Sequence, residues 1–453
     1  MDVSADYLKI LASPVDGKPL KVEDGVLKSA GGGTQYPEIQ GIPWIYSDPI
    51  AALNEWKSRT QQTLLQMQSQ FYAAAHALEQ NPPNLFPTTR RRLEILCNAY
   101  KHNIQATQRI LSDFSISSES DLVPEYKTLS EKLPGSQRID SYSTNLFRDW
   151  AWEGNENQKH FEQIKKVLPN NMAGKNIVVL GAGSCRLALD IHLHTNPKWT
   201  LAVDINPYLL LAAKKILEGE EIHLYDFPLA PFQIGDVCPY HECKSNTKKP
   251  ENFHYLFADG MNPPFQAKSI DCVITPWFID IVPQTLGPLT RKINNILKED
   301  GVWINFGPLG FNSPDPTRNL CIQEIEEIMQ DSGFTLEVDQ IDEVPYLQTP
   351  HSGQKRTEKV YSFQAKRTKS VKSPPRFTYL PEWILNPSLP IPKSTKVEEH
   401  RFRNQVYFEV LKSINGEYSI NDLELMIQQH YKMTEEQAKV ALYSFFIQFY
   451  EAR

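Results

Sequence analysis

The stretch that most constrains the fold is residues 176–204, NIVVLGAGSCRLALDIHLHTNPKWTLAVD. Its apolar run at 177–180 predicts a buried strand, which the glycines break before apolar residues resume at helical spacing. Such a turn lets a ligand approach the backbone, because a Cβ at Gly181 or Gly183 would take up the space. A second strand ends on Asp204, whose carboxylate can accept both hydroxyls of a ribose. The pattern indicates a nucleoside-binding α/β fold.

The ligand needs a further argument, because NAD and S-adenosylmethionine both use a glycine turn followed by an acidic strand end. The dinucleotide fingerprint has a third glycine where the helix meets the pyrophosphate, and this chain has Arg186 there. A third strand approach ends at Asp259, and a fourth strand, 270–274, runs into residues 275–278, TPWF. In methyltransferases an Asp at the end of the third strand lies beside the adenine, and the fourth strand ends next to the methyl group that is transferred. This arrangement favours S-adenosylmethionine as cofactor.

The donor-binding residues follow from this arrangement. We predict that Gly181 and Gly183 contact the methionine portion, Arg186 its carboxylate, Asp204 the ribose and Asp259 the adenine amino group. A short glycine turn alone often binds nothing, so the prediction depends on the order of both aspartates and the fourth strand. For Arg186, a salt bridge within its own helix is the alternative.

Four motifs carry a resemblance to a known family. They are RDW at 148–150, GAG followed by Arg186-Leu187, WFID at 277–280 and GVWINFGPL at 301–309. From about 148 to about 363, the chain resembles the carnosine N-methyltransferase family. The resemblance implies a Rossmann-like class I methyltransferase sheet, an α/β fold, and S-adenosylmethionine-dependent methylation of a small imidazole or peptide-like nucleophile. It also places Trp150 at the donor pocket.

The acceptor-side residues are carried over from the same resemblance. The Asp matching Asp280 holds the substrate imidazole through its N–H, which keeps the other ring nitrogen unprotonated and aimed at the methyl carbon. Where the family has a histidine, this chain has Asn312, which can hydrogen-bond but cannot carry a proton. A different peptide-like or amine acceptor is therefore an alternative. Tyr346 and Tyr361, near the family's C-terminal tyrosines, are candidates for the pocket wall.

Residues 1–50 predict a small hairpin module that resembles the zinc ribbons accompanying some methyltransferases. Ser13 and Asp16 occupy the positions of the first cysteine pair, and residues 29–32 contain no thiol. Without soft ligands we expect no zinc, packing by apolar residues, and a role as lid or protein contact. Residues 51–147 predict a helical extension, with an antiparallel helix pair and an irregular segment from 116.

The methyltransferase domain is predicted at 148–366, with a last strand that runs antiparallel. Between the second and third strands lies a long segment without regular period, which could wall the acceptor site. Residues 367–399 are rich in Lys, Ser and Pro and predict a semi-rigid linker. Residues 400–453 predict a small helical module, which loosely resembles peptide-recognition winged helices and could bind a protein or peptide.

Composition excludes several classes of protein. The net charge is −7 and no basic excess points to nucleic acid. There is no signal-peptide pattern and no run of eighteen apolar residues, so we expect a cytoplasmic protein without membrane contact. The six scattered cysteines are expected to be reduced, and Cys238, His241 and Cys243 lack the partners for a metal site. The alternatives to a carnosine-type enzyme are a peptide-modifying methyltransferase that uses the C-terminal module, and a non-catalytic nucleoside-fold protein.

Overall fold

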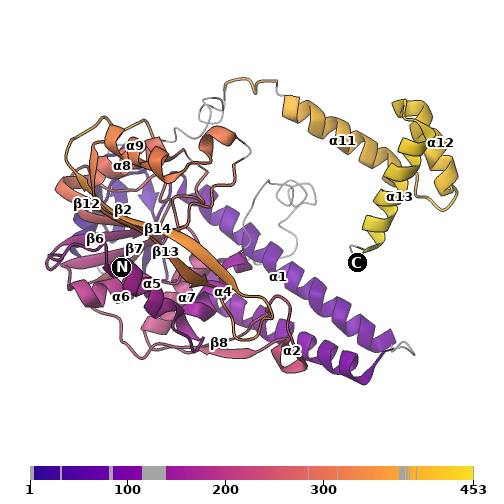
Figure 1. Cartoon of the computed structure of the whole chain (residues 1–453), viewed down its shortest axis with the longest axis horizontal. Coiled ribbons are helices and arrows are strands. Elements are labelled where there is room, and N and C mark those ends of the chain that lie inside the picture. The colour runs from indigo at the N-terminus through magenta and orange to yellow at the C-terminus, as the bar shows by residue number, and fades with distance from the viewer. Residues whose placement is uncertain are drawn as a thin grey trace. The chain divides into compact units, whose positions relative to one another are not determined.

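A computed structural model describes residues 5–30, 33–80, 85–114, 139–283, 285–313, 315–376, 383, 386, 388–393 and 395–451. It has two compact units, residues 1–379 and 380–453, which are described separately. The first unit, whose helices and strands are labelled in Figure 1, contains the glycine turn and all the predicted site residues.

The centre of the first unit is a nine-stranded sheet with the order β13-β14-β12-β11-β6-β7-β10-β5-β4. Its parallel part comprises β10 (Phe253–Ala258), β7 (Trp199–Asp204), β6 (Asn176–Leu180), β11 (Ile270–Pro276) and β12 (Leu297–Gly307). Beside β12 lies β14 (Arg356–Arg367), which runs antiparallel to both of its neighbours, and at the edge lies β13 (Phe334–Tyr346), which runs in the same direction as the parallel strands. The parallel strands are buried on both faces, as their near-continuous apolar sequences predict.

Counted from β6 along the chain, the seven strands from β13 to β10 stand in the order six, seven, five, four, one, two, three. The count leaves out the hairpin of residues 222–243, which is not in this sheet, and the strands β5 and β4, which precede β6 in the chain. This is the sheet of class I methyltransferases, including the antiparallel last strand. The predicted fold class is confirmed.

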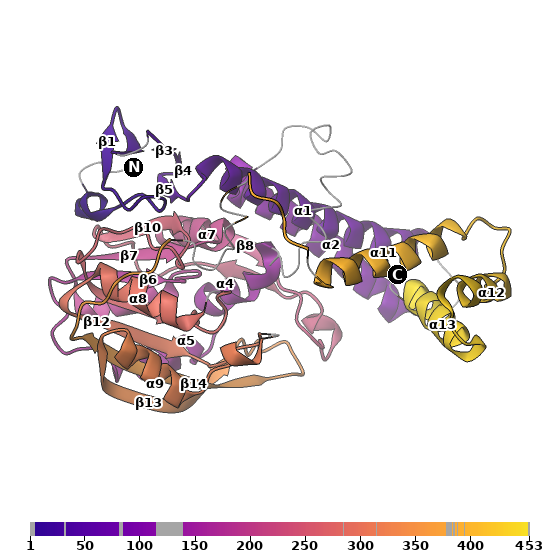
Figure 2. The same cartoon turned by 90° about the horizontal axis from the view of Figure 1, so that it is seen from above.

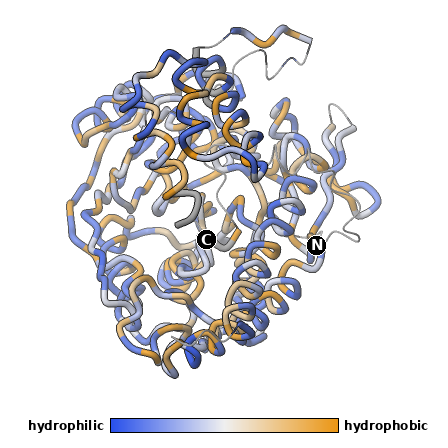
Figure 3. The backbone as a smooth tube through the Cα atoms, turned by 90° about the vertical axis from the view of Figure 1, so that its right-hand side faces the viewer, coloured by the Kyte–Doolittle hydropathy of each residue, from blue (hydrophilic) through white to orange (hydrophobic). Residues whose placement is uncertain are grey.

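Helices cover both faces of the sheet (Figure 2). One face carries α4 (Ser143–Trp150), α5 (Glu156–Lys165), α6 (Arg186–Thr195) and α7 (Pro207–Leu217). The other carries α8 (Leu286–Ile296) and α9 (Ile322–Asp331). Figure 3 shows the alternation of hydrophobic and hydrophilic residues along the chain that lets each helix bury one side.

Part of the N-terminal segment joins this sheet, whereas the sequence predicts a separate module for residues 1–50. Its elements are η1 (Asp6–Ile10), β1 (Leu20–Glu23), β2 (Val26–Ser29), β3 (Gln35–Tyr36), β4 (Glu38–Ile39) and β5 (Ile42–Ile45). The first three strands form their own small sheet, whereas β5 pairs in parallel with β10. Without β5, the outer side of β10 would be a sheet edge with unpaired backbone groups. Its partner is more than 200 residues away in the chain, so no local pattern predicts the pairing.

The N-terminal segment also completes a helical layer. Only residues 259–269 separate β10 from β11, and they contain no helix. The space that a crossover helix usually fills is packed by Tyr7, Leu8 and Leu11, which are buried in the same cluster as Phe265. The backbone of Ala12 donates to the carbonyl of Pro264, 2.8 Å away.

Ser13 and Asp16, at the positions where a zinc ribbon has its first cysteine pair, are part of a polar cluster with Tyr36. The Ser13 hydroxyl accepts hydrogen bonds from the backbone of Val15 and Asp16 and from the Tyr36 hydroxyl. The guanidinium of Arg376 lies over the turn, 3.3 Å from the position that a Cβ on Gly17 would take. Burial lowers the pKa of Arg376, while the charge of Asp16 acts in the opposite direction. A cation of the chain therefore faces this turn.

The helical extension is the long pair α1 (Pro49–Gln80) and α2 (Pro87–Ile110), which pack against each other (Figure 1). The predicted irregular segment lies largely outside the described residues. The region between the second and third strands is not irregular throughout, because β8 (Ile222–Tyr225) and β9 (Tyr240–Cys243) form a hairpin. Asn103 of α2 binds this hairpin by donating to the carbonyl of Tyr225 and accepting from its N–H.

The second unit contains three helices and no strand among its described residues. They are α11 (Thr395–Lys412), α12 (Ile420–Tyr431) and α13 (Glu435–Glu451), and α11 begins within the predicted linker. Ser419 caps α12 and Thr434 forms a capping box with Gln437, as the sequence predicts. A small core of Val410, Leu423, Ile427, Ala438 and Leu442 holds the helices together.

Candidate active site

The glycine turn after β6 has a left-handed backbone at three positions. The φ angles are +77° at Gly181, +56° at Gly183 and +68° at Cys185. The N–H groups of Gly181 and Ala182 both donate to the carbonyl of Val203, at 2.9 and 3.0 Å. These bonds fix the turn to the end of β7, so the glycines and Asp204 lie at one edge of the sheet.

The RDW motif holds this turn from the outside. Trp150, which is buried, donates from Nε1 to the carbonyl of Ser184 at 2.8 Å. The hydroxyl of Ser184 donates to the carboxylate of Asp149, and Arg148 pairs with the same carboxylate at 2.7 Å. Trp150 therefore lies beside the glycine turn and stabilises it through this hydrogen bond. Its contact with the methyl donor stays a prediction.

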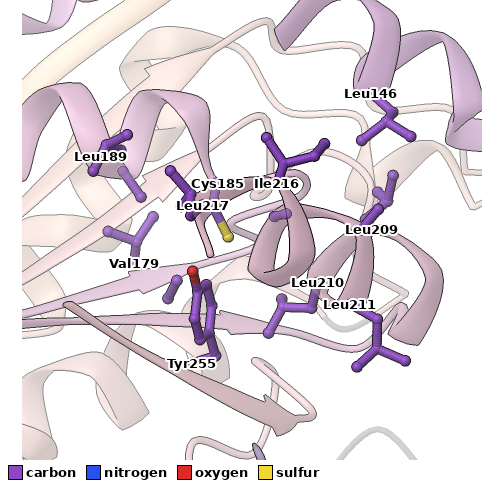
Figure 4. Close-up of a cluster of buried hydrophobic side chains, with 14 of the residues drawn as sticks. Leu146, Val179, Cys185, Leu189, Leu209, Leu210, Leu211, Ile216, Leu217 and Tyr255 are labelled. Atoms are coloured by element: carbon purple, nitrogen blue, oxygen red, sulfur yellow. The ribbon is translucent and has the colours of Figure 1, made fainter. Parts of the chain in front are cut away.

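Cys185 packs beneath the turn as a small hydrophobic residue. Figure 4 shows it among leucines of α7 with the hydroxyl of Tyr255 pointing toward it. Burial raises the pKa of its thiol well above the ordinary value. The six cysteines are all free, in agreement with the expected reduced state.

Arg186 makes the ion pair that the alternative interpretation predicts. Its Nε lies 3.1 Å from the carboxylate of Asp190, one turn along α6. The same guanidinium donates to the carbonyl of Asp149 and lies over the Trp150 ring, 5.7 Å from the ring centre. Its assignment to the methionine carboxylate stays a prediction.

Asp204 and Asp259 end neighbouring strands. Phe257 is paired with Asp204 in the sheet, which places the Asp259 backbone two residues beyond that level. The carboxylate of Asp204 accepts from the N–H of Gly183 at 2.7 Å and from that of Asn206 at 2.8 Å. Burial raises its pKa, and these two bonds oppose the rise. An ionised carboxylate oxygen can accept more than one hydrogen bond, so capacity for ribose hydroxyls is left.

The residue closest to Gly181 is one that the sequence argument did not assign. A Cβ at Gly181 would lie 2.8 Å from the ring of Phe278, and a Cβ at Gly260 would lie 2.8 Å from the same ring. No atom stands within 4 Å of the corresponding position at Gly183. Glycine at 181 is therefore needed for the Phe278 ring, whereas the space beside Gly183 is open.

The backbone turns at Trp277, so the rings of Trp277 and Phe278 pack against different parts of the site. Its φ is +51°, a conformation that costs a bulky residue energy and recurs at functional sites. Its N–H donates to the carbonyl of Phe306 at 2.8 Å. Its ring lies 4.4 Å from that of Tyr346 and 5.5 Å from that of His160, while Phe278 packs on the glycines.

Asp280 has one satisfied and one unsatisfied oxygen. Oδ2 accepts from the N–H of Gly310 at 2.9 Å, and a Cβ at Gly310 would lie 3.1 Å from it. Oδ1 is buried and has no hydrogen-bond partner. Burial raises the pKa of the carboxyl, and the nearby charge of Glu358 adds to the rise. A buried, unpaired acceptor at this place is suited to bind an N–H group.

The other predicted acceptor residues divide into two groups. Tyr346 packs against Trp277 with its ring tilted by 33°, and it lies under the guanidinium of Arg356, 4.9 Å from the ring centre. Tyr361 is buried in the cluster on the side of α8 and α9, and its hydroxyl donates to Glu326 at 3.4 Å. Asn312 is exposed in the loop after β12. The structure brings Tyr346 to the Trp277 ring, and does not bring Tyr361 there.

Three further residues near the acceptor side were missed by the sequence argument. His160 is buried, its Nε2 is 2.8 Å from the carbonyl of Pro345, and burial lowers its pKa to about 4, so the imidazole is neutral. Glu358 pairs with Arg356 and acts electrostatically on both Asp280 and Tyr346. Arg356 and Glu358 reach the site through the pairing of β14 with β13. Such long-range pairing leaves no local pattern in the sequence.

The described residues contain no group of three or more His, Cys, Asp or Glu side chains that could hold a metal ion. Within the same residues, no helix is both long and apolar enough to cross a membrane.

A family model for carnosine N-methyltransferase matches residues 127–369, slightly more than half of the 453 residues. The chain belongs to the carnosine N-methyltransferase family. The predicted family is thereby confirmed, together with the class of enzyme and its methyl donor: an S-adenosylmethionine-dependent methyltransferase.

Family relatives are distant in sequence. The chain is 23% identical over 295 residues to "Carnosine N-methyltransferase" of Rattus norvegicus, covering 58% of this chain and 72% of that protein. It is 24% identical over 320 residues to the protein of the same name from Dictyostelium discoideum, covering 61% and 67%.

Among solved structures, one similar chain comes from a complex of the Haloferax volcanii Trm112 methyltransferase activator and a putative methyltransferase. It has 13% identity, covers 51% of this chain and 98% of that chain, and has a TM-score of 0.34. The class I methyltransferase fold is identified by the strand order of the sheet and by the family match.

The donor site of this family member fits its cofactor. Two carboxylates end adjacent strands, and an open space adjoins Gly183, which is compatible with a nucleoside-containing donor. The assignments of Asp204 to the ribose, Asp259 to the adenine and Gly183 to the methionine portion stay predictions. S-adenosylmethionine supplies an electrophilic methyl group when bound. The protein contributes the positions of the two reacting molecules.

Proposed function

We propose that this enzyme methylates a ring nitrogen of a small imidazole-containing substrate of the carnosine type. The observation that carries the proposal is the buried, unpartnered Oδ1 of Asp280, three residues after Trp277, whose ring contacts that of Tyr346. Phe278, in the same four-residue segment, packs on Gly181 and Gly260 of the donor side. One segment therefore contacts both half-sites, which suits a reaction that depends on alignment.

In the proposed mechanism, Asp280 accepts the N–H of the imidazole and so fixes the tautomer whose other nitrogen is unprotonated. That nitrogen uses its lone pair to form the bond to the methyl carbon as the bond from carbon to sulfur breaks. The positive charge passes to the imidazole ring, where the carboxylate stabilises it. The raised pKa of Asp280 makes it a stronger hydrogen-bond acceptor than an exposed carboxylate.

Two further groups support a zwitterionic, peptide-like substrate. Glu358 and Arg356, paired at the start of β14, offer one negative and one positive charge near Tyr346. An imidazole dipeptide carries an amine and a carboxylate that could pair with them. Asn312, exposed in place of the family's histidine, leaves other small peptide-like amines as alternative acceptors.

The test is a substrate screen by mass spectrometry that looks for the gain of one methyl group. Carnosine, histidine, small amines and short peptides are incubated with wild-type protein and with Asp280→Asn. We expect the variant to lose about a hundredfold or more in kcat/KM with unchanged donor affinity. Asp331→Asn, an exposed carboxylate on α9, is the matched control. Wild-type activity in Asp280→Asn would contradict the assignment.

We also propose, as a second candidate, that the enzyme acts on a peptide recognised by residues 395–451. The supporting observation is that this unit exposes Phe402, Tyr407, Phe408, Tyr418 and Tyr443 at its surface. Peptide recognition by residues 395–451 does not require that they form a winged helix, nor that residues 1–50 bind zinc. Peptides methylated by the full chain, but not by residues 1–379, would support it. Equal methylation by both would remove the recognition role.

A further inference from the structure

Tyr46 brings the N-terminal segment to the donor site. The parallel pairing of β5 with β10 aligns Trp44 with Phe257 and Ile45 with Ala258. Tyr46 follows directly, at the level of Asp259 and at the carboxyl edge of the sheet, where open α/β folds bind their ligands. The pairing thus brings a residue 158 positions before Asp204 to the same edge of the sheet, one strand away across β10.

The Tyr46 side chain is fixed by its surroundings. It is buried, with 8% of its surface exposed, and its ring lies 4.5 Å from that of Trp44. Its hydroxyl donates to the carbonyl of Ile205 at 3.1 Å. Burial raises the pKa of Tyr46 well above the ordinary value, and Asp204 and Asp259 add to the rise, so the hydroxyl stays protonated and remains a donor.

The carbonyl that accepts this bond belongs to the turn carrying the ribose-binding carboxylate. Ile205 stands between Asp204 and Asn206, and the N–H of Asn206 donates to Asp204 Oδ1 at 2.8 Å. Asn206 then caps α7 by accepting from the N–H of Tyr208. An anchored Ile205 carbonyl therefore fixes the backbone on which the orientation of Asp204 depends.

We propose that Tyr46 is a positioning residue for the methyl donor, and that the N-terminal strand is a built-in part of the donor site. Its hydroxyl holds the Asp204–Asn206 turn in the orientation that presents the carboxylate to the ribose. This inference rests on the assignment of Asp204 to the ribose and is independent of the acceptor.

The experiment measures the dissociation constant for S-adenosylhomocysteine by calorimetry in the full chain. Tyr46→Phe removes one hydroxyl and keeps the ring, so we expect binding weaker by about three- to tenfold, the effect of one hydrogen bond. Tyr36→Phe is the matched control, because it removes a buried hydroxyl from the same N-terminal segment that bonds to Ser13 instead. Thermal unfolding of both variants checks that they are folded.

A double-mutant cycle separates positioning from general destabilisation. If Tyr46 acts through Asp204, then Tyr46→Phe weakens binding in the wild-type background and has no added effect in Asp204→Ala. 5′-Methylthioadenosine, which lacks the amino-acid portion, should lose the same factor as S-adenosylhomocysteine. In turnover, the donor KM should rise while kcat and the acceptor KM are unchanged.

Three results would overturn the inference. They are an unchanged dissociation constant in Tyr46→Phe, an equal loss in the Asp204→Ala background, and a loss of the same size in Tyr36→Phe. None of these bears on Asp280, so the proposed acceptor chemistry would stand or fall separately.

Discussion

At the scale of single residues, the site is built from backbone conformations that most side chains avoid. Cys185 and Trp277 have φ of +68° and +51°, and they lie in the turns that follow β6 and β11. Such conformations cost about 1–3 kcal/mol and persist only when surrounding contacts enforce them. Here the contacts are the burial of Cys185 and the hydrogen bond from Trp277 to Phe306.

Two glycines of the donor turn allow a matched comparison. Gly181→Ala and Gly183→Ala both place a side chain on a left-handed backbone, which costs about 1–2 kcal/mol in either case. Only at Gly181 would the added Cβ also lie 2.8 Å from the Phe278 ring. We expect Gly181→Ala to lower the free energy of unfolding by at least about 1 kcal/mol more than Gly183→Ala, by overpacking.

Urea unfolding of the two variants measures this difference. Phe278→Leu combined with Gly181→Ala should recover part of the lost stability, because the shorter side chain relieves the contact. Equal losses for the two glycines would show that the Phe278 ring does not press on Gly181.

At the scale of elements, the N-terminal strands depend on partners far along the chain. β5 pairs with β10, η1 packs beside the β10–β11 crossover, and Arg376 covers the turn at Gly17. The N-terminal segment is therefore held in place by the methyltransferase domain and by the segment that follows it. Its metal-free state stays a prediction.

Arg376 provides the test at this scale. Arg376→Gln removes the cation facing Asp16 and Tyr36, and we expect it to lower the free energy of unfolding by about 0.5–1 kcal/mol, the value of a partly exposed charge interaction. Lys372→Gln, an exposed cation in the same segment, is the control. Urea unfolding with and without a zinc chelator measures both claims. Unchanged stability in Arg376→Gln, or a loss of stability on chelation, would contradict them.

At the scale of the whole molecule, the two units have separate cores. The core of the second unit consists of residues from α11, α12 and α13 alone, and the first unit contains every residue assigned to donor and acceptor. A separate core allows a unit to fold independently of its neighbour.

A protein ending at residue 379 tests this independence. We expect its dissociation constant for S-adenosylhomocysteine to stay within about twofold of the full chain, because no donor-site residue is removed. Calorimetry measures the affinity, and circular dichroism confirms folding. Loss of donor binding in a folded, shortened protein would show that the second unit contributes to the site.

The sequence by itself determined the parallel centre of the sheet and the kind of methyl donor. Buried strands, a glycine turn and strand-end aspartates are local patterns, and the parallel strands place Gly183, Asp204 and Asp259 at one edge. The order of the motifs was then sufficient to indicate S-adenosylmethionine.

The tertiary structure alone decided which distant side chains meet. Tyr46 reaches Ile205 through the pairing of β5 with β10, and Glu358 comes near Asp280 through the β13–β14 hairpin. It also decided that Tyr361 faces Glu326 on α9 instead of the ring of Trp277. Residues on a strand alternate between its two faces, so one step in register reverses the direction of a side chain. Strand pairing over long distances leaves no local pattern, which is why the sequence predicted the sheet but not these contacts.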